Sequence, residues 1–449
     1  MTLVTAFNMY YGLTKAVTNV IKEVGSDQQK ETYIEKFMSG SYGGTMCLTE
    51  PGAGSDVGAA KSTAEKMDDG RYKIKGTKIF ISSGDNDLYE NIIHLVLART
   101  PGAPEGTKGL SLFIVAKNNI DSGESNNVVC TKIEEKMGMH GSSTCEMIFG
   151  HEGDTYGELI GEELEGMKNM FIMMNEARLL CGVQGDAQGT MAYNFSNQYA
   201  KERTQFGTEI INLPDVKRMI LKMRSMTRGL KALNLYASNL FDKAKKDPSF
   251  QDEIAFYTPL CKSFSTDEGF QICIDAIQVH GGYGYCKEYG VEQFARDSKI
   301  ATIYEGTNGI QSIDFVTRKI LRDGGKTITK VFSQINEALK KGQSEWPKEC
   351  ALLEKSLQGA QEIVQKFGEA AKNKNESYIL SHCTDFLNYC GNTIVSWLLL
   401  EMALTANEQM TGASGDQLEF YNSKKEDFQV YSQHYLVRNQ GIHTTITGF

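Results

Sequence analysis

Residues 296–311, RDSKIATIYEGTNGIQ, place one carboxylate, that of Glu305, in a turn between two short elements. Gly306 follows the carboxylate at once, and a new helical pattern begins at Thr307 or Asn308. A carboxylate in such a turn is held by backbone at the entrance of a helix and projects into the adjacent cleft. When its surroundings raise its pKa, it is suited to take a proton from carbon. The dipole of the following helix also explains a lone Glu at this place, so the rest of the chain must decide.

The chain divides into a strand-rich segment and long helical segments. Residues 42–149 alternate with period two and contain Gly and Asp turns, which predicts a β domain of modest size. Residues 1–39 are predicted to form two helices, the second capped by Ser26 and Asp27. The remaining segments have helical periodicity and lie near residues 163–202, 216–246, 252–280, 308–322 and 326–438. This segregated order predicts an α+β fold in which helix dominates.

The length and composition are those of a globular protein with several domains. A chain of 449 residues is too long for one core, so two to four domains are expected. The 56 acidic and 47 basic side chains give a net charge of −9, which argues against nucleic acid or an anionic membrane as the main partner. The most apolar run, residues 394–406, contains Glu401 and is predicted to be a buried helix, not a membrane span.

The cysteines and the start of the chain indicate a reducing compartment. Ten cysteines occur without a CxxC pair or a regular spacing, so a set of structural disulfides is not expected. Residues 1–20 lack a basic n-region and a cleavage-type ending, so no signal peptide is predicted, and a cytoplasmic location is expected. Four cysteines lie in apolar surroundings and are predicted to be core residues: Cys47, Cys181, Cys261 and Cys273.

A loop with the sequence CLTEPGAGSD, residues 47–56, follows the first predicted strand. Its Pro and two Gly residues expose backbone N–H groups, and Thr49 and Ser55 add hydroxyl groups, which suits a phosphate or the polar edge of a flavin. An ordinary turn has the same composition. The loop is not a dinucleotide-binding fingerprint, because the glycine spacing differs and no helix follows.

Arg203 closes a long predicted helix in the stretch AKERTQFG, residues 200–207. A guanidinium there can grip a pyrophosphate through two parallel hydrogen bonds, or it can simply complement the helix dipole. His280, in QVHGGYG at residues 278–284, is predicted to be structural. No second His stands at metal-ligand spacing, so no zinc site is expected.

Taken together and in order, these segments resemble the acyl-CoA dehydrogenase family. The matching stretches are the loop at residues 47–56, KIFISSG at 78–84, RTQFG at 203–207, QVHGGYG at 278–284 and the Glu305 turn. The resemblance runs from residue 1 to about residue 325. Beyond it, two segments resemble the extra C-terminal helical domain of a longer subfamily that includes 3-methylmercaptopropionyl-CoA dehydrogenases: Gly391–Leu399 and Phe420–Tyr421.

The resemblance implies a fold with four parts. They are a remnant of an N-terminal helical domain (1–40), a barrel-like middle β domain (41–160), a C-terminal four-helix bundle (161–325) and an additional C-terminal helical domain (326–449). Family members begin with a full N-terminal helical domain, of which this chain has only the last two helices. We therefore expect a truncated chain with an open apolar face that consists of Tyr10, Tyr11, Leu13, Val17 and Ile21.

The resemblance also implies the activity, which is FAD-dependent conversion of an acyl-CoA thioester to a trans-2-enoyl-CoA. Glu305 is implied as the catalytic base for the α-proton, with hydride transfer to flavin N5 and an electron-transfer flavoprotein as electron acceptor. A homodimer or homotetramer is implied, since the family segment around Arg203 contacts the flavin of a neighbouring subunit. Many members carry Trp where this chain has Phe80, so stacking is kept but an indole N–H is lost. The residues implied in FAD binding are Met46, Leu48, Thr49, Ser55, Phe80, Ser82, Arg203, Phe206, Gln278, Gly281, Gly282 and Thr307. Those implied in binding the substrate are Ser55, Asn175, Arg178 and Tyr304.

Three alternatives stay open. Some relatives place the base directly before the Arg of the segment NEAR at residues 175–178, where this chain has Ala177, so Glu176 is a weaker candidate than Glu305. An acyl-CoA oxidase would pass its electrons to O₂ in place of a carrier protein. A truncated, non-catalytic homologue would be a flavin-free scaffold. The length and identity of the acyl chain are left undetermined.

Overall fold

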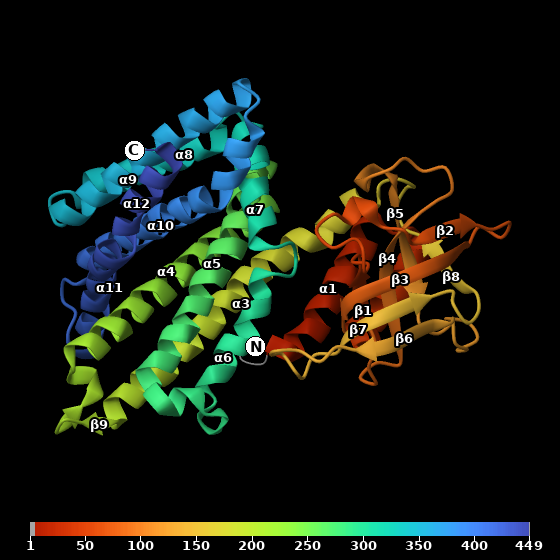
Figure 1. Cartoon of the computed structure of the whole chain (residues 1–449), viewed down its shortest axis with the longest axis horizontal. Helices are drawn as coiled ribbons and strands as arrows, with labels where there is room; N and C mark the ends of the chain where they lie inside the picture. Colours follow the sequence, from red (N-terminus) through yellow and green to blue (C-terminus); the bar gives the residue numbers. More distant parts are fainter. Residues whose placement is uncertain (1–4, 449) are drawn as a thin grey trace. The chain divides into compact units, whose positions relative to one another are not determined.

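The computed structural model describes residues 5–448, and the chain divides into two compact units, residues 1–177 and 178–449. Figure 1 colours the first unit red to yellow and the second yellow to blue. Strands are concentrated in the first unit and helices dominate the second, which confirms the predicted α+β class. No helix within residues 5–448 combines the length and the apolar character that a membrane span requires.

The first unit begins with two helices, α1 (Thr5–Val24) and α2 (Asp27–Ser39). Ser26 caps α2 as predicted, because its hydroxyl accepts from the amide of Gln29 and the Gln29 side chain accepts from the amide of Ser26. Gly40 ends the helix in the left-handed region, with φ of 81°.

Eight strands form one sheet in the order β1-β4-β5-β8-β3-β7-β6, and β2 pairs with both β3 and β4. β1 runs parallel to β4, whereas the other neighbours along this order are antiparallel. The strands are β1 (Tyr42–Cys47), β2 (Thr63–Lys66), β3 (Tyr72–Ser82), β4 (Asn91–Arg99), β5 (Leu110–Ala116), β6 (Val128–Ile133), β7 (Thr144–Phe149) and β8 (Thr155–Leu159).

Helix α1 lies against β1, which corrects one expectation from the sequence (Figure 1). The contact is close, because a Cβ on Gly44 would lie 2.8 Å from the Cβ of Val17, and the Gly44 amide donates to Thr14 Oγ1 over 3.0 Å. Four residues of the face that was expected to be open are buried within the unit: Tyr10, Leu13, Val17 and Ile21. Only Tyr11 of that set is exposed, so the β domain itself covers the apolar face.

The second unit consists almost entirely of helices. The C-terminal part of α3 (Gly166–Glu202) belongs to it, and a small hairpin of β9 (Thr204–Gln205) and β10 (Thr208–Glu209) follows that helix. The first set of further helices is α4 (Pro214–Ala244), α5 (Gln251–His280), α6 (Val291–Ser298) and α7 (Asn308–Asp314), the last continued by a π-helical segment, Phe315–Leu321. The second set is α8 (Lys326–Gly342), α9 (Pro347–Lys372), α10 (Glu376–Gln409), α11 (Gly415–His434) and α12 (Asn439–Thr447).

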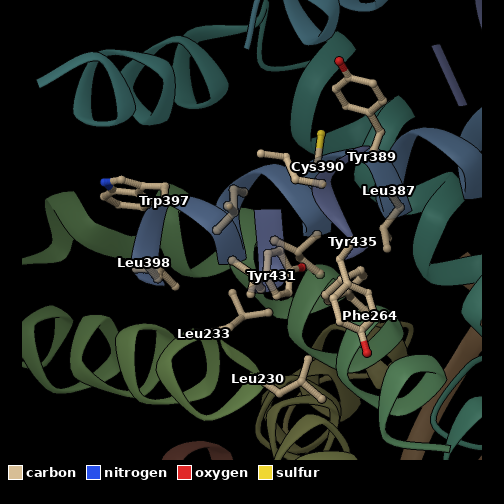
Figure 2. Packing of buried hydrophobic residues seen from close by; sticks show 14 of the residues in the cluster. Leu230, Leu233, Phe264, Leu387, Tyr389, Cys390, Trp397, Leu398, Tyr431 and Tyr435 are labelled. Carbon is tan, nitrogen blue, oxygen red and sulfur yellow. The ribbon is translucent and has the colours of Figure 1, made fainter. Parts of the chain in front are cut away.

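One hydrophobic core joins both sets of helices in the second unit. Figure 2 shows Leu230 and Leu233 of α4 beside Leu398 of α10 and Tyr431 of α11. Two salt bridges reinforce this packing, because the buried carboxylate of Asp427 in α11 contacts two arginines of α4. The predicted division near residue 325 therefore falls within a continuous core, and it stays a prediction about domain organisation.

Helices α3 and α5 approach each other very closely. A Cβ on Gly185 would lie 2.4 Å from the backbone oxygen of Ser265, and one on Gly269 would lie 2.3 Å from the oxygen of Gly185. Only glycine fits at both positions. This crossing brings the residues of α3 after Ala177 against the middle of α5, and the candidate base lies beside it.

Candidate active site

Glu305 occupies a strained turn at the entrance of α7, as the sequence predicted. Its φ is +58°, in the left-handed region, which costs roughly 1–2 kcal/mol for a residue with a Cβ. The turn is held because the backbone oxygen of Glu305 accepts from Gln311 Nε2 at 3.1 Å and from Arg178 Nε at 3.4 Å. Thr307 caps the helix, with its Oγ1 accepting from the amide of Ile310 at 3.3 Å. Backbone strain of this kind is frequent at functional sites, which is in keeping with the prediction for Glu305.

The side chain of Glu305 is buried at its tip and incompletely paired. Oε2 is buried and has no hydrogen-bond partner among the described residues. Burial raises the pKa of this carboxyl, while the charges of Arg178 and Lys262 act in the opposite direction without cancelling the rise. A carboxylate in this condition has a free lone pair and a basicity above that of an exposed Glu.

Helices α3 and α5 supply the other side chains around Glu305 in this unit. The Tyr304 hydroxyl donates to Gln184 Oε1, and burial raises the pKa of Tyr304 well above its usual value. Burial, together with the charge of Glu305, raises the pKa of the Cys181 thiol to about 12, so this cysteine is a neutral core residue. Lys262 lies in α5 with no exposed surface, and its Nζ donates to Asn308 Oδ1 over 2.7 Å.

Glu176, the weaker candidate for the base, has other partners within the first unit. Its Oε1 forms a salt bridge with Lys15 Nζ, and its Oε2 accepts from Asn19 Nδ2 at 2.8 Å. Both carboxylate oxygens are therefore engaged by α1. Asn175, a proposed substrate contact, is exposed on the same helix.

In the first unit, a buried ion pair fixes the loop at residues 47–56. Glu50 Oε1 accepts from Lys78 Nζ at 2.8 Å and from the Ser62 amide at 3.1 Å, and its Oε2 accepts from the Lys61 amide at 2.6 Å. Lys78 has no exposed surface and also donates to the backbone oxygen of Leu48 at 3.0 Å. The Glu50 carboxylate thus organises the backbone on both sides of the loop.

Phe80 stands at an irregular point of β3 beside this loop. Its φ is +57°, the pairing of β3 with β7 shifts register between Lys78 and Ile81, and the ring is 60% exposed. The amide of Ile79 donates to the backbone oxygen of Thr49 at 2.9 Å, which joins the loop to the strand. This bond places Thr49 beside the residue that precedes Phe80. Of the remaining first-unit candidates, Leu48 is buried, Met46 and Ser82 are half-buried, and Ser55 is exposed.

In the second unit, the two motifs at residues 203–207 and 278–284 meet where α3 and α5 end. The Arg203 guanidinium lies 5.3 Å from the ring centroid of Tyr283, and Tyr199 stacks on His280 with ring centroids 4.3 Å apart. His280 Nδ1 also bonds the backbone oxygen of Ala276 at 2.8 Å, which is a structural role. Phe206 is 92% exposed.

Comparison with known proteins decides the family. Models of the acyl-CoA dehydrogenase middle domain and C-terminal domain match residues 45–151 and 165–321, and an "acetyl-CoA dehydrogenase C-terminal like" model matches residues 329–448. The 3-methylmercaptopropionyl-CoA dehydrogenase of Ruegeria pomeroyi is 38% identical over 482 residues, covering 99% of this chain and 79% of that protein. The chain belongs to the acyl-CoA dehydrogenase family.

Further relatives and solved structures agree with this assignment. A caffeyl-CoA reductase–Etf complex subunit of Acetobacterium woodii is 35% identical over 292 residues, covering 64% of this chain and 71% of that protein. The acyl-CoA dehydrogenase of Bacillus anthracis, solved in complex with FAD, is 23% identical and has a TM-score of 0.77. The match covers 95% of this chain and 72% of that one, and it establishes the shared fold.

As an acyl-CoA dehydrogenase, the protein is an FAD-dependent oxidoreductase, and the residues present fit that cofactor. Phe80 and Phe206 offer exposed aromatic faces, one in each unit. At Gly281 and Gly282 an added Cβ would meet no atom within 4 Å, so their backbone faces open space. Such a surface lets a nucleotide approach the main chain closely.

Sequence reasoning missed four polar or sulfur-containing neighbours of Glu305: Cys181, Gln184, Lys262 and Asn308. One signal for Lys262 was available. It stands in an apolar part of α5, between Phe256 and Phe264, where a helix exposed on one face would not place a charge. The contacts themselves join residues far apart in the sequence, and no local pattern reports them.

Proposed function

We propose that this acyl-CoA dehydrogenase converts an acyl-CoA thioester to a trans-2-enoyl-CoA, with Glu305 as the base that removes the α-proton. The observation that carries the proposal is the state of this carboxylate, which combines a buried, partnerless Oε2, a raised pKa and a strained turn at a helix entrance. Structural carboxylates have no need of these three properties together.

The α-hydrogen of a thioester is a weak acid, so the site must stabilise negative charge on the carbonyl oxygen as the proton leaves. The backbone amide of Glu305 is placed to contribute, because it donates none of the hydrogen bonds found among the described residues. Glu305 would hold the proton at Oε2, where no neighbour competes for it. FAD, when bound, would accept the hydride from the β-carbon.

The proposed FAD contacts lie in both units. In the first unit they are Met46, Leu48, Thr49, Ser55, Phe80 and Ser82. In the second they are Arg203, Phe206, Gln278, Gly281, Gly282 and Thr307. The proposed substrate contacts are Ser55, Asn175, Arg178 and Tyr304. Because a guanidinium grips phosphate through paired hydrogen bonds, Arg203 is proposed to bind the pyrophosphate of a neighbouring subunit's FAD in a homodimer or homotetramer.

The proposed electron acceptor is an electron-transfer flavoprotein in the cytoplasm. The relative from Acetobacterium woodii, which is named as part of an Etf complex, supports a partner of this kind. An acyl-CoA oxidase would instead form peroxide without any added protein. Because Glu305 can return a proton as well as remove one, the reverse reduction of an enoyl-CoA is tested in the same experiment.

The test is an anaerobic absorbance spectrum of the purified protein. The protein is expected to be yellow, and a panel of acyl-CoA thioesters of increasing length should bleach the flavin band, with the most effective member identifying the acyl class. An enoyl-CoA should restore the band of the chemically reduced protein. A colourless protein that takes up no added FAD would favour the scaffold, and peroxide formed in air without a carrier would favour the oxidase.

A further inference from the structure

We propose that Lys262 is a positioning residue for proton abstraction: held by Asn308, its ammonium anchors the turn that carries Glu305 and acts electrostatically on that carboxylate. The inference rests on the proposed role of Glu305 as the base. It concerns a side chain of α5, 43 positions before Glu305 in the sequence, that does not belong to the turn itself.

The anchoring part of the role follows from the hydrogen bonds of Asn308. Lys262 Nζ donates to Asn308 Oδ1 at 2.7 Å, and Asn308 Nδ2 donates to the Ser263 backbone oxygen at 3.2 Å and to Thr266 Oγ1 at 3.1 Å. Asn308 is the first residue of α7. The entrance of α7 is therefore fastened to the middle of α5, and Glu305 sits three residues before that point.

The hydrogen bond to Asn308 explains a donor at position 262, but it does not explain why that donor carries a positive charge. Lys262 has no exposed surface, and among residues 5–448 its Nζ donates to Asn308 Oδ1 and forms no salt bridge with a carboxylate. Burying an ammonium with only an amide oxygen as partner is costly, and a neutral donor such as Gln would satisfy Asn308 at lower cost. The charge is accounted for if it acts on Glu305, with which Lys262 interacts electrostatically.

Lys262 is suited to remain charged while it acts. Burial lowers the pKa of Lys262 to about 8, with Cys181, Asp267 and Glu305 among the groups that resist the fall. The ammonium form therefore still predominates at neutral pH. The Lys262 charge in turn opposes the rise in the pKa of Glu305 that burial causes. Without it, the carboxyl would be protonated, and inactive as a base, over a wider range of pH.

Other titratable or charged groups surround the same carboxyl, and the experiment must separate them from Lys262. Arg178 is the second cation near Glu305, and its Nε also contacts the Glu305 backbone oxygen. Asp314 acts electrostatically on Arg178, and Asp267 acts on Lys262 without forming a salt bridge with it. The full set comprises Arg178 and Cys181 on α3, Lys262 and Asp267 on α5, Tyr304 in the turn, and Asp314, Arg318 and Lys319 from α7 onward.

The test compares the pH dependence of anaerobic flavin bleaching in four proteins. These are the wild type, Lys262→Gln, Lys262→Arg and Asn308→Ala. Lys262→Gln keeps a donor for Asn308 but removes the charge, so the acid limb of the pH–rate curve should move upward by on the order of one pH unit. Bleaching should then be about tenfold slower below that limb and recover toward the wild-type rate above it. Asn308→Ala removes the acceptor of Lys262 Nζ and frees the entrance of α7, so it should lower the rate at every pH and move the limb by no more than Lys262→Gln does.

Two control measurements distinguish a misfolded variant from a folded one with altered activity. Flavin content and melting temperature report folding independently of activity, and Lys262→Met replaces Lys262→Gln if the latter does not fold. An unmoved limb in a folded neutral variant overturns the proposal, as does a limb that moves in Lys262→Arg, which retains the charge. Bleaching that survives Glu305→Gln in an otherwise unchanged protein would instead overturn the proposed function, so the two failures are distinguishable.

Discussion

The two units each contain a buried carboxylate near a buried lysine, and the two arrangements differ in a way that separates structure from chemistry. In the first unit, Glu50 contacts Lys78 directly and accepts from two further backbone amides. In the second, Lys262 is bonded to an amide oxygen, and Glu305 keeps one oxygen without a partner. The same two residue types thus give a fully satisfied pair in one unit and, in the other, an incompletely paired carboxylate that is the proposed base.

The pKa values show the consequence of this difference. Burial tends to raise the pKa of Glu50, but Lys78 and the amides outweigh it and hold the pKa below its usual value. For Glu305 the burial outweighs the two neighbouring cations, and the pKa is raised. A carboxylate whose hydrogen bonds and cation partner are all present stays ionised near neutral pH. One that lacks a partner has a higher pKa and can take up and release a proton.

The largest expected effect comes from replacing Glu305, the incompletely paired carboxylate of the two. Glu305→Gln should retain flavin but lose bleaching by acyl-CoA by a factor of about 10³ or more, because an amide cannot accept the α-proton. Stopped-flow absorbance measures the loss. Glu176→Gln is the matched control, since its carboxylate is already engaged by Lys15 and Asn19. Comparable bleaching by both variants would remove Glu305 from the role of base.

Breaking the ion pair between Lys78 and Glu50 should lower the stability of the protein without changing the rate of proton abstraction per bound flavin. Lys78→Met leaves the buried Glu50 charge without its cation, and such a loss costs about 3–5 kcal/mol of the free energy of unfolding. Urea denaturation of the first-unit transition measures it. The double variant Lys78→Met with Glu50→Gln should recover part of this loss, because no buried charge is then left alone. A fall of less than about 1 kcal/mol in the free energy of unfolding would show that water reaches the ion pair between Lys78 and Glu50.

A second satisfied carboxylate, Asp427, extends the comparison into the helices of the second unit. It has no exposed surface, and it contacts Arg224 Nε at 2.8 Å as well as Arg228 Nη1. Asp427→Asn should lower the free energy of unfolding by about 2–3 kcal/mol, since Arg224 keeps a partner in Glu426. Bleaching per bound flavin should be unchanged. A selective loss of bleaching would mean that this ion pair and the Glu305 turn are coupled.

The smallest expected effect concerns Glu268, a carboxylate that is less completely paired than Glu50. Its nearest cation, Arg438, is 3.8 Å away, and burial raises the pKa of Glu268 to about 7. Because the folded-state pKa lies above the unfolded value near 4.5, the protonated form favours the folded state. The stability from this group is present below about pH 4.5 and is lost as pH rises to about 7.

Glu268→Gln should remove that pH dependence. Thermal melts at pH 5 and pH 8 should show the variant to be more stable than the wild type at pH 8, by about 1–2 kcal/mol after allowance for its partial exposure. At pH 5 the two proteins should be nearly equal. Equal stability at both values would place the pKa of Glu268 close to that of an ordinary Glu.

Much of this could be predicted from the sequence where the determinants are local. The turn at Glu305 and the cap at Ser26 follow from residues within a few positions of one another. Other features depend on contacts distant in the sequence. The face of α1 that contains Val17 was predicted to be open from the resemblance to family members with a fuller helical domain, and periodicity could not show that β1 covers it. Lys262 was missed for the same reason, since its partner Asn308 is 46 residues away.

The left-handed turn at Glu305 has a consequence for how this protein is adapted. Glycine would occupy φ of +58° without steric cost, so position 305 would be more stable with the residue that ends all chemistry there. A chain selected only for stability would have no carboxylate at position 305. With Glu305 as the proposed base, the unfavourable conformation is a loss of stability accepted for activity, and stabilising redesign of the chain should leave this turn unchanged.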